Sequence, residues 1–169
     1  MRLLFELNSG DFDPNGTAFV RPSVRAIIRQ EGRVAMVHSL KYDYYKFPGG
    51  GIEPGEQQEQ TLIRETKEEA GLVVLPASIR EYGYVHRVQG RKDGSVFIQD
   101  NYYYLCDTLP EQLNQQLDDY EAEERFTLEY VDPRQAIGVN RSPDHGPKDQ
   151  QMLEREARVL ECLMAEGLL

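Results

Sequence analysis

Glutamates gather behind a glycine-rich turn in the middle of the sequence, over residues 50–72. If residues 57–70 form a helix, Glu65, Glu68 and Glu69 lie on one stripe, because residues three and four positions apart are neighbours on a helix. Three like charges on one stripe repel each other, so the stripe needs a cationic partner. Hard divalent cations such as Mg²⁺ bind carboxylate oxygens and keep positions open for water and substrate phosphates. The spacing therefore predicts a divalent-metal site that handles phosphate groups.

The segments around these glutamates are suited to hold them in place. The adjoining arc of the same helix is suited to burial against a sheet and consists of Leu62, Ile63, Thr66 and Ala70. Gly71 is expected to end the helix in a left-handed conformation. The prolines and glycines of residues 48–55 favour a turn before the helix. The sequence therefore predicts a loop, helix, loop unit whose acidic side faces a cleft.

The same stretch carries a pattern of fixed residues and spacings. The pattern reads Gly50, Glu56, Arg64-Glu65, Glu68-Glu69 and Gly71-Leu72. In these positions the stretch resembles the box of the Nudix hydrolases. Thr66 departs from the family pattern, which has a bulky aliphatic residue there, although Thr is β-branched and close to Val in shape. The resemblance implies an α/β/α sandwich with a mixed β-sheet between helices, and hydrolysis of a nucleoside diphosphate linked to another group.

The resemblance also implies roles for the residues that match the box. Glu65, Glu68 and Glu69 are expected to bind Mg²⁺, with Mn²⁺ as an alternative, and the carbonyl of Gly50 to add a ligand. Glu65, or a glutamate from a later loop, is expected to orient or deprotonate water. The expected catalytic set is Glu65, Glu69, Arg64 and Glu56, with the last two bracing the ligands. If the carboxylates only repel each other, exchanging Glu69 for Gln leaves the fold intact or slightly more stable.

Further candidates lie in an acidic run over residues 111–124, because a later acidic residue helps to bind metal or acts as base in many members of the resembled family. Glu121, Glu123 and Glu124 are the options, and we choose Glu124. The alternative is an ordinary solvated face, which is the usual role of a charged run.

Candidates for substrate binding are aromatic and basic. Tyr44, Tyr45 and Phe47 precede the glycine turn and form either a partly buried loop or a wall on which a base or sugar stacks. Arg87 is the candidate donor to phosphate, because guanidinium binds phosphate oxygens in pairs. Arg91 and Lys92 are better explained as the solvated tip of a hairpin.

The remaining sequence predicts the elements of one domain, over residues 1–169. Its 169 residues are 40% hydrophobic and contain no linker-like segment. We expect an N-terminal extension over 1–20 that includes a surface loop at 8–16, and a covering helix over 147–167. Strands are expected over 2–7, 23–30, 34–37, 79–89, 95–106 and 126–131, and a short helix ends at 137.

Charge and cysteine content narrow the partners. The net charge of −10, from 29 acidic and 19 basic residues, argues against a nucleic-acid duplex or an anionic membrane as the main partner. Cys106 and Cys162 have no paired spacing, which indicates free thiols in a reducing compartment. No apolar N-terminal run is long enough for a signal or membrane segment. We therefore expect a cytoplasmic protein, with a homodimer as an option that the family suggests.

The substrate expected from the resemblance is a nucleoside triphosphate, including oxidised nucleotides. ADP-ribose, nucleotide sugars and dinucleoside polyphosphates remain open, because residues outside the box select the substrate. A nucleotide sensor without catalysis and an isoprenoid diphosphate isomerase are the rivals from other classes. The isomerase needs a reactive cysteine, whereas Cys106 stands late in an expected strand.

Overall fold

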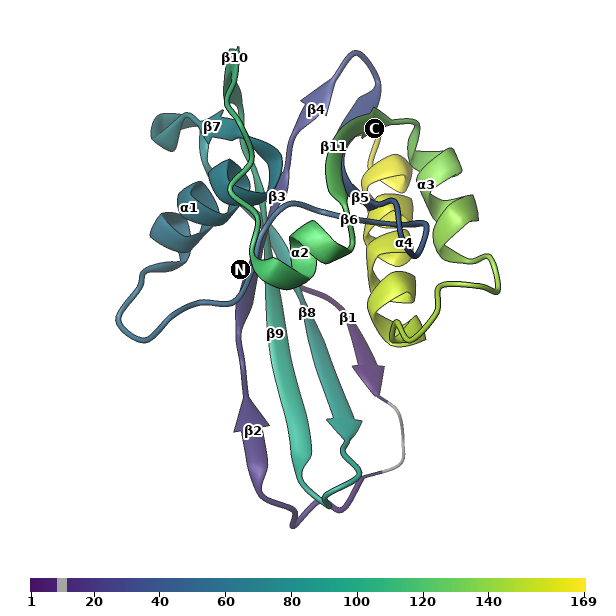
Figure 1. Ribbon diagram of the computed structural model, residues 1–169. Helices are drawn as coiled ribbons and strands as arrows, with labels where there is room; N and C mark the ends of the chain where they lie inside the picture. Colours follow the sequence, from purple (N-terminus) through teal and green to yellow (C-terminus); the bar gives the residue numbers. More distant parts are fainter. Residues whose placement is uncertain (9–11) are drawn as a thin grey trace.

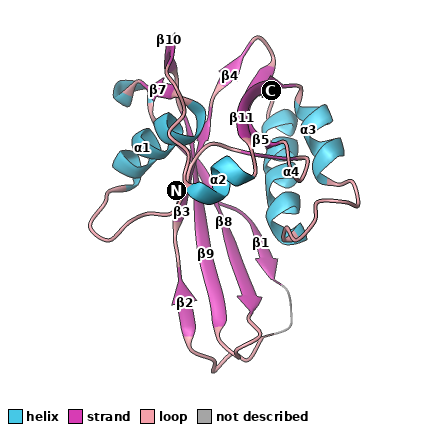
Figure 2. Ribbon diagram, viewed as in Figure 1, coloured by secondary structure: helices cyan, strands magenta, loops and turns pink. Residues whose placement is uncertain are grey.

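The computed structural model describes residues 1–8 and 12–169. The described residues form eleven strands and four α-helices, whose arrangement Figures 1 and 2 show. The strands are β1 (Leu3–Asn8), β2 (Ala18–Val20), β3 (Ser23–Ile27), β4 (Arg29–Gln30), β5 (Arg33–Ser39), β6 (Tyr44–Lys46), β7 (Leu72–Val74), β8 (Arg80–Gly90), β9 (Val96–Leu105), β10 (Thr108–Gln112) and β11 (Phe126–Val131). The helices are α1 (Gln58–Ala70), α2 (Asp119–Glu123), α3 (Pro133–Asn140) and α4 (Gln150–Ala165). Part of the loop expected over 8–16 lies outside the described residues.

The strands form mixed sheets. The hairpin of β8 and β9 is antiparallel, with Arg80 opposite Leu105 at one end and Gly90 opposite Val96 at the other. Strands β2 and β3 both pair with β9 in parallel, and β1 pairs with β8 in parallel. A second sheet has the order β11-β5-β4, with β6 on β5, and β7 pairs with β10. The extension expected over residues 1–20 thus supplies two strands to the main sheet.

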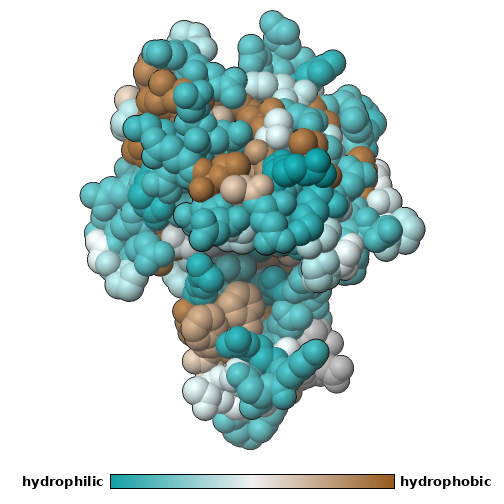
Figure 3. Space-filling model, viewed as in Figure 1, coloured by the Kyte–Doolittle hydropathy of each residue, from teal (hydrophilic) through white to brown (hydrophobic). Residues whose placement is uncertain are grey.

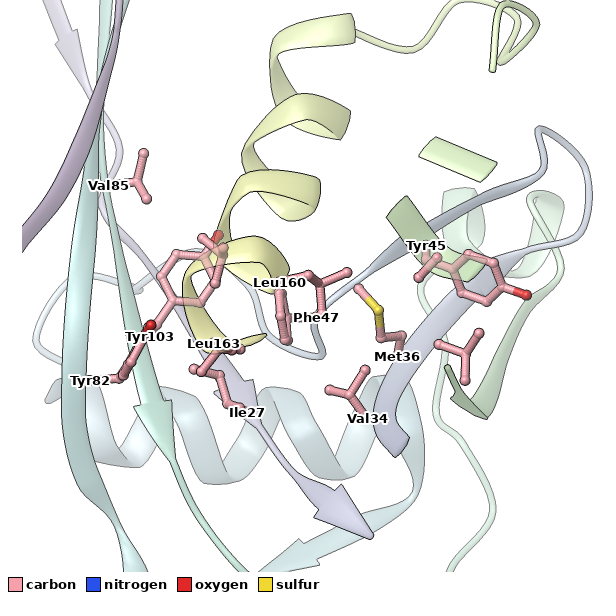
Figure 4. Close-up of a cluster of buried hydrophobic side chains, with 13 residues drawn as sticks. Ile27, Val34, Met36, Tyr45, Phe47, Tyr82, Val85, Tyr103, Leu160 and Leu163 are labelled. Carbon is pink, nitrogen blue, oxygen red and sulfur yellow. The ribbon is translucent and has the colours of Figure 1, made fainter. Parts of the chain in front are cut away.

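Helices cover both faces of the central strands, so β3 is buried along its whole length. Along β3, Val24 and Ala26 belong to the core on the α1 side, whereas Ile27 belongs to the core on the α4 side. Figure 4 shows Leu160 and Leu163 of α4 beside Ile27 in that second core. The α/β/α arrangement expected from the sequence is confirmed.

Local signals define the helix ends. Gln57 and Gln60 form a reciprocal capping box at the start of α1, and Gly71 ends it with a φ of 67°. Helix α4 begins after Asp149, whose carboxylate accepts a hydrogen bond from the Gln151 backbone N–H at 2.9 Å. It therefore spans Gln150–Ala165, which corrects the expected range of 147–167. The acidic run contains a short helix, α2, that the sequence analysis did not predict.

The long hairpin extends beyond the helices. In Figures 1 and 2, the ends of β8 and β9, flanked by β1 and β2, form an arm below the helical layers.

None of the described helices combines the length and the apolar character needed to cross a membrane. Cys106 and Cys162 are free thiols, as expected.

Asn140 at the end of α3 joins that helix to strand β6. Its side-chain oxygen accepts from the backbone N–H of Tyr45 at 2.7 Å, and its amide donates to the Tyr45 carbonyl at 2.8 Å. We expect Asn140→Ala to lower the free energy of unfolding by about 2–3 kcal/mol, because two buried backbone groups lose their partners. Urea unfolding measures the change, with the exposed neighbour Gln135→Ala as the control. Equal stability of the two variants would contradict this account of β6.

Candidate functional site

The glycine turn lies directly against helix α1, beside the carboxylate of Glu65. Gly49 has a φ of 137°, and a side chain there would clash with the backbone oxygen of Val24. A Cβ on Gly50 would overlap the carboxylate of Glu65. The Gly50 carbonyl accepts a hydrogen bond from the Val24 N–H at 3.0 Å. Glycine is therefore needed at both positions for the chain to pass between β3 and α1.

Glu69 is the buried member of the acidic stripe, with 1% of its surface exposed. Its carboxylate accepts hydrogen bonds from the ammonium of Lys46 and from the backbone N–H of Gly49, the latter at 2.9 Å. Removing its charge would leave a buried, unpaired lysine, which is costly. This corrects the expectation that Glu69→Gln leaves the fold intact or more stable. Lys46 could not be identified as the partner from the sequence, because β6 is only three residues long.

Arg64 gathers the other glutamates of the box. Its guanidinium binds Glu56 through two hydrogen bonds of 2.7 and 2.8 Å. A third nitrogen donates to Glu65 at 2.7 Å and to Glu68 at 3.0 Å. The contact of Arg64 with Glu68 is the one expected from the helical spacing. The bracing role of Arg64 and Glu56 stays a prediction, and their contacts are consistent with it.

The electrostatics of the site come from burial and from neighbouring charges. Burial raises the pKa of Glu65, an effect that Arg64 opposes. Burial raises the pKa of Glu121 in α2 as well, and the adjacent carboxylate of Glu69 adds to the rise. Carboxylates from two different helices therefore lie close together at Glu69, which pairs with Lys46.

The donors at this site fit a hard divalent cation, because all of them are oxygens. Within the described residues no three acidic, histidine or cysteine side chains converge as ready-made metal ligands. Lys46 and Arg64 instead neutralise Glu69 and Glu65. The positions of Lys46 and Arg64 show where the site requires positive charge. At Gly50, backbone rather than a side chain lies beside the Glu65 carboxylate.

Of the glutamates in the acidic run, Glu121 is the one beside Glu69. The carboxylate of Glu124 points elsewhere: it accepts from the Tyr44 hydroxyl at 2.8 Å and from Ser39 at 3.1 Å, and it pairs with Lys148. The ligand role of Glu124 stays a prediction, and Glu121 is the glutamate of this run that lies beside Glu69. The reason is the phase of α2, whose capping box fixes the Glu121 side chain on the Asp118 N–H.

The aromatic residues before the turn form part of the core. Tyr44, Tyr45 and Phe47 are all buried. The Tyr45 ring stacks on His38 at 4.2 Å between centroids, and Phe47 meets Tyr103 edge to face at 5.5 Å. They present no aromatic wall to a ligand, which corrects their assignment as substrate-binding residues. Strand β6 is covered on one side by α3 and α4, and this layer could not be inferred from the local sequence.

Arg87 is buried, with 5% of its surface exposed. It forms an ion pair with Asp149 and a hydrogen bond to Gln89. Its guanidinium is thus largely committed within the protein, and burial lowers its pKa. It nevertheless lines a cavity together with Arg91 and Lys92, which the sequence analysis treated as a solvated tip.

Buried charges from distant segments hold the turn. Arg25 of β3 donates to the carbonyl oxygens of Phe47, at 3.4 Å, and Gly49. Glu156 of α4 accepts from the Phe47 N–H at 2.8 Å, and Arg155 binds this carboxylate at 2.6 and 2.8 Å. Buried charged side chains therefore hold the backbone before the glycines through hydrogen bonds from both sides.

Comparison with known proteins agrees with this arrangement. Residues 20–155 match the NUDIX domain. An RNA pyrophosphohydrolase of Pseudomonas putida is 41% identical over 61 residues, which are 36% of each chain. A CTP pyrophosphohydrolase of Escherichia coli K12 is 36% identical over 74 residues, which are 40% of this chain and 53% of the relative. The chain thus spans only about a third to a half of the curated relatives it matches.

Solved structures share the fold. A NUDIX hydrolase from Nitrosomonas europaea superimposes with a TM-score of 0.59 and 19% identity, over 88% of this chain and 90% of that one. A MutT structure from work on Aliivibrio salmonicida and Vibrio cholerae gives a TM-score of 0.55 and 17% identity, over 88% and 99%. At these identities the likeness concerns the fold alone.

The Arg64–Glu56 contact makes the free energy of unfolding depend on pH. Hydrogen bonds from Arg64 and Thr61 lower the pKa of Glu56 to about 2, against about 4.3 in an unfolded chain. The contact therefore stabilises the fold above about pH 5, and the benefit is lost as the pH falls towards 2. We expect Glu56→Gln to be less stable by about 1 kcal/mol at pH 7, since the pair is partly exposed. Urea unfolding from pH 7 to pH 3 should show this gap narrowing, and a gap that does not change with pH would contradict the assignment.

Proposed function

This chain belongs to the NUDIX family, and we propose that it hydrolyses a phosphoanhydride bond in a nucleoside diphosphate linked to another group. The observation that carries the proposal is the glycine turn, which sets the Gly50 backbone against the Glu65 carboxylate and donates the Gly49 N–H to Glu69. Carboxylates held beside a backbone turn suit a site where a divalent cation and a diphosphate bind together.

The residues proposed to hold the cation are Glu65, Glu68, Glu69 and the carbonyl of Gly50, with Glu121 in the place first given to Glu124. When bound, a Mg²⁺ or Mn²⁺ ion would neutralise charge on the diphosphate and lower the pKa of a water molecule. Glu65 or Glu121 would accept the proton of the attacking water. Arg64 and Glu56 would hold Glu65 and Glu68 in position.

The leading substrate is a nucleoside triphosphate, including oxidised forms. The relative named a CTP pyrophosphohydrolase supports this choice. ADP-ribose, nucleotide sugars and dinucleoside polyphosphates remain the alternatives. The isomerase alternative loses its nucleophile, because burial raises the pKa of the Cys106 thiol to about 12.

A substrate panel tests the reaction and its metal requirement. We expect the protein freed of metal by EDTA to be inactive on nucleoside triphosphates, nucleotide sugars and dinucleoside polyphosphates, and Mg²⁺ or Mn²⁺ to restore release of phosphate or pyrophosphate. Glu65→Gln should lower kcat at least about 100-fold, because it removes a proton acceptor at the reacting centre. Chromatography of the products measures this, and Glu59→Gln, on the exposed side of α1, is the control.

Two results would contradict the proposal. Full activity of Glu65→Gln would remove this residue from the reaction. Tight nucleotide binding in calorimetry, with no product released from any member of the panel, would identify a nucleotide sensor instead.

The two glutamates of the acidic run have separable expected effects. Glu121→Gln should lower kcat about 10- to 100-fold with little loss of stability, because its carboxylate lies beside Glu69. Glu124→Gln should mainly lower the urea midpoint, since Lys148 and Tyr44 lose a charged partner. Parallel assays and unfolding curves measure both effects. The opposite pattern would restore Glu124 to the site.

A further inference from the structure

A cluster of polar side chains is buried between the main sheet and helix α4. Hydrophilic residues otherwise cover most of the surface, as Figure 3 shows for one face. Strand register builds half of the cluster, because Ser23 of β3 is paired with Asn101 of β9, and Arg25 with Tyr103 on the same face. Helix α4 adds two charged residues. The members, each at most 9% exposed, are Ser23, Arg25, Asn101, Tyr103, Arg155 and Glu156.

The ion pair of Arg155 and Glu156 is the centre of this cluster. The Arg155 guanidinium binds one oxygen of the Glu156 carboxylate at 2.6 and 2.8 Å. The Tyr103 hydroxyl donates to the same oxygen at 3.3 Å. The third Arg155 nitrogen donates to the side-chain oxygen of Asn101 at 2.7 Å, which also accepts from the Ser23 hydroxyl at 2.7 Å. Side chains of both β3 and β9 therefore hold the pair in place.

The cluster contacts the glycine turn, residues 48–51, from both ends. The second oxygen of Glu156 accepts from the backbone N–H of Phe47 at 2.8 Å, directly before the turn. At the other end, Ser23 forms a β-bridge with Gly51. Between these ends, β3 donates backbone hydrogen bonds of 2.8 and 3.0 Å to carbonyls of the turn. The backbone is thus held along the whole turn.

Stability alone does not explain an ion pair at this depth. Arg155 is 1% exposed and Glu156 is 0% exposed. Taking two charges out of water is costly, so apolar side chains of similar volume often stabilise a core equally well. An apolar side chain cannot accept the hydrogen bond from the Phe47 N–H. The contact with the turn is therefore what distinguishes this pair from an apolar replacement.

We propose that Arg155 and Glu156 are positioning residues for the cation of the proposed function, and that they set the preference for Mg²⁺ over Ca²⁺. The inference rests on the proposed function, because it requires the Gly50 carbonyl to be a ligand of that cation. Mg²⁺ needs near-ideal octahedral geometry at about 2.0–2.1 Å, whereas Ca²⁺ accepts flexible arrangements of oxygens at about 2.3–2.6 Å. A carbonyl on a held backbone suits the smaller ion, and a carbonyl on a movable backbone follows the larger one.

Two double variants separate the hydrogen bond to the turn from the ion pair. Both replace the buried guanidinium by an apolar side chain, which cores commonly tolerate when the partner charge is removed as well. Arg155→Met/Glu156→Gln keeps an amide oxygen for the Phe47 N–H, whereas Arg155→Met/Glu156→Leu has no acceptor there. The matched control is Arg141→Met/Glu154→Gln, which removes a partly exposed ion pair between the end of α3 and the same helix α4.

Metal affinity is measured without nucleotide and without turnover. The electron paramagnetic resonance signal of free Mn²⁺ reports binding, and Mg²⁺ and Ca²⁺ are added as competitors to give the ratio of the Ca²⁺ Kd to the Mg²⁺ Kd. We expect Arg155→Met/Glu156→Leu to lower this ratio at least about tenfold, because its turn can follow the larger ion. Arg155→Met/Glu156→Gln and the control should stay within about twofold of the unaltered protein, since both keep an acceptor for the turn.

A further variant keeps the test decisive if the leucine variant does not fold. Glu156→Asp retains a negative charge opposite Arg155 but is one methylene shorter, so it withdraws from the Phe47 N–H. We expect the Phe47 amide to exchange its hydrogen at least about tenfold faster in this variant, because the closed state loses an acceptor. The metal ratio should fall with it, and an unchanged ratio would overturn the proposal.

The outcomes separate this inference from the proposed function. A merely structural pair would lower the urea midpoint of the double variants and leave the metal ratio unchanged, which would overturn the inference. A ratio that falls equally in the leucine and glutamine variants would overturn it too, because the hydrogen bond would not matter. If the unaltered protein binds no Mn²⁺, or Glu65→Gln binds it equally well, the metal site of the proposed function fails instead.

Discussion

The contact on which the site depends is the buried pair of Lys46 and Glu69, with the Gly49 N–H as a further donor to the same carboxylate. It ties three segments together: strand β6, the glycine turn and helix α1. A buried carboxylate without these donors would be expensive, because its charge leaves water without compensation. The turn therefore keeps its path only while the Glu69 carboxylate keeps these two donors. That path in turn sets the Gly50 backbone against Glu65.

The helix and its bracing could be predicted because they depend on short-range spacing. Arg64 reaches Glu68 one turn away, and a period of 3.6 residues is enough to infer that contact. Lys46 was not predicted, because a three-residue strand carries too little pattern to show which way its side chains point. Glu121 and Glu124 could not be ranked from composition, since the rotation of α2 decides which carboxylate faces Glu69.

The aromatic residues also show that the local sequence does not reveal contacts between distant segments. Tyr44 and Tyr45 have polar tips beside a loop, which is equally consistent with a ligand wall and with a core. Their hydroxyls bind Glu124 and Glu129, residues about 80 positions later. Phe19 and Phe97 meet only because β2 and β9 pair in parallel with that register. A pairing between two such distant strands leaves no trace in either segment alone.

The position of Glu156 near the end of the chain affects the order in which contacts can form during synthesis. The N–H of Phe47 finds its acceptor 109 residues further along the chain, on α4. During synthesis the complete box therefore emerges well before the side chain that orders the turn in front of it. A nascent chain that already contains Glu65 and Glu69 still lacks this acceptor for the Phe47 N–H. The Phe47 N–H therefore gains this acceptor only after α4 has been made and docked.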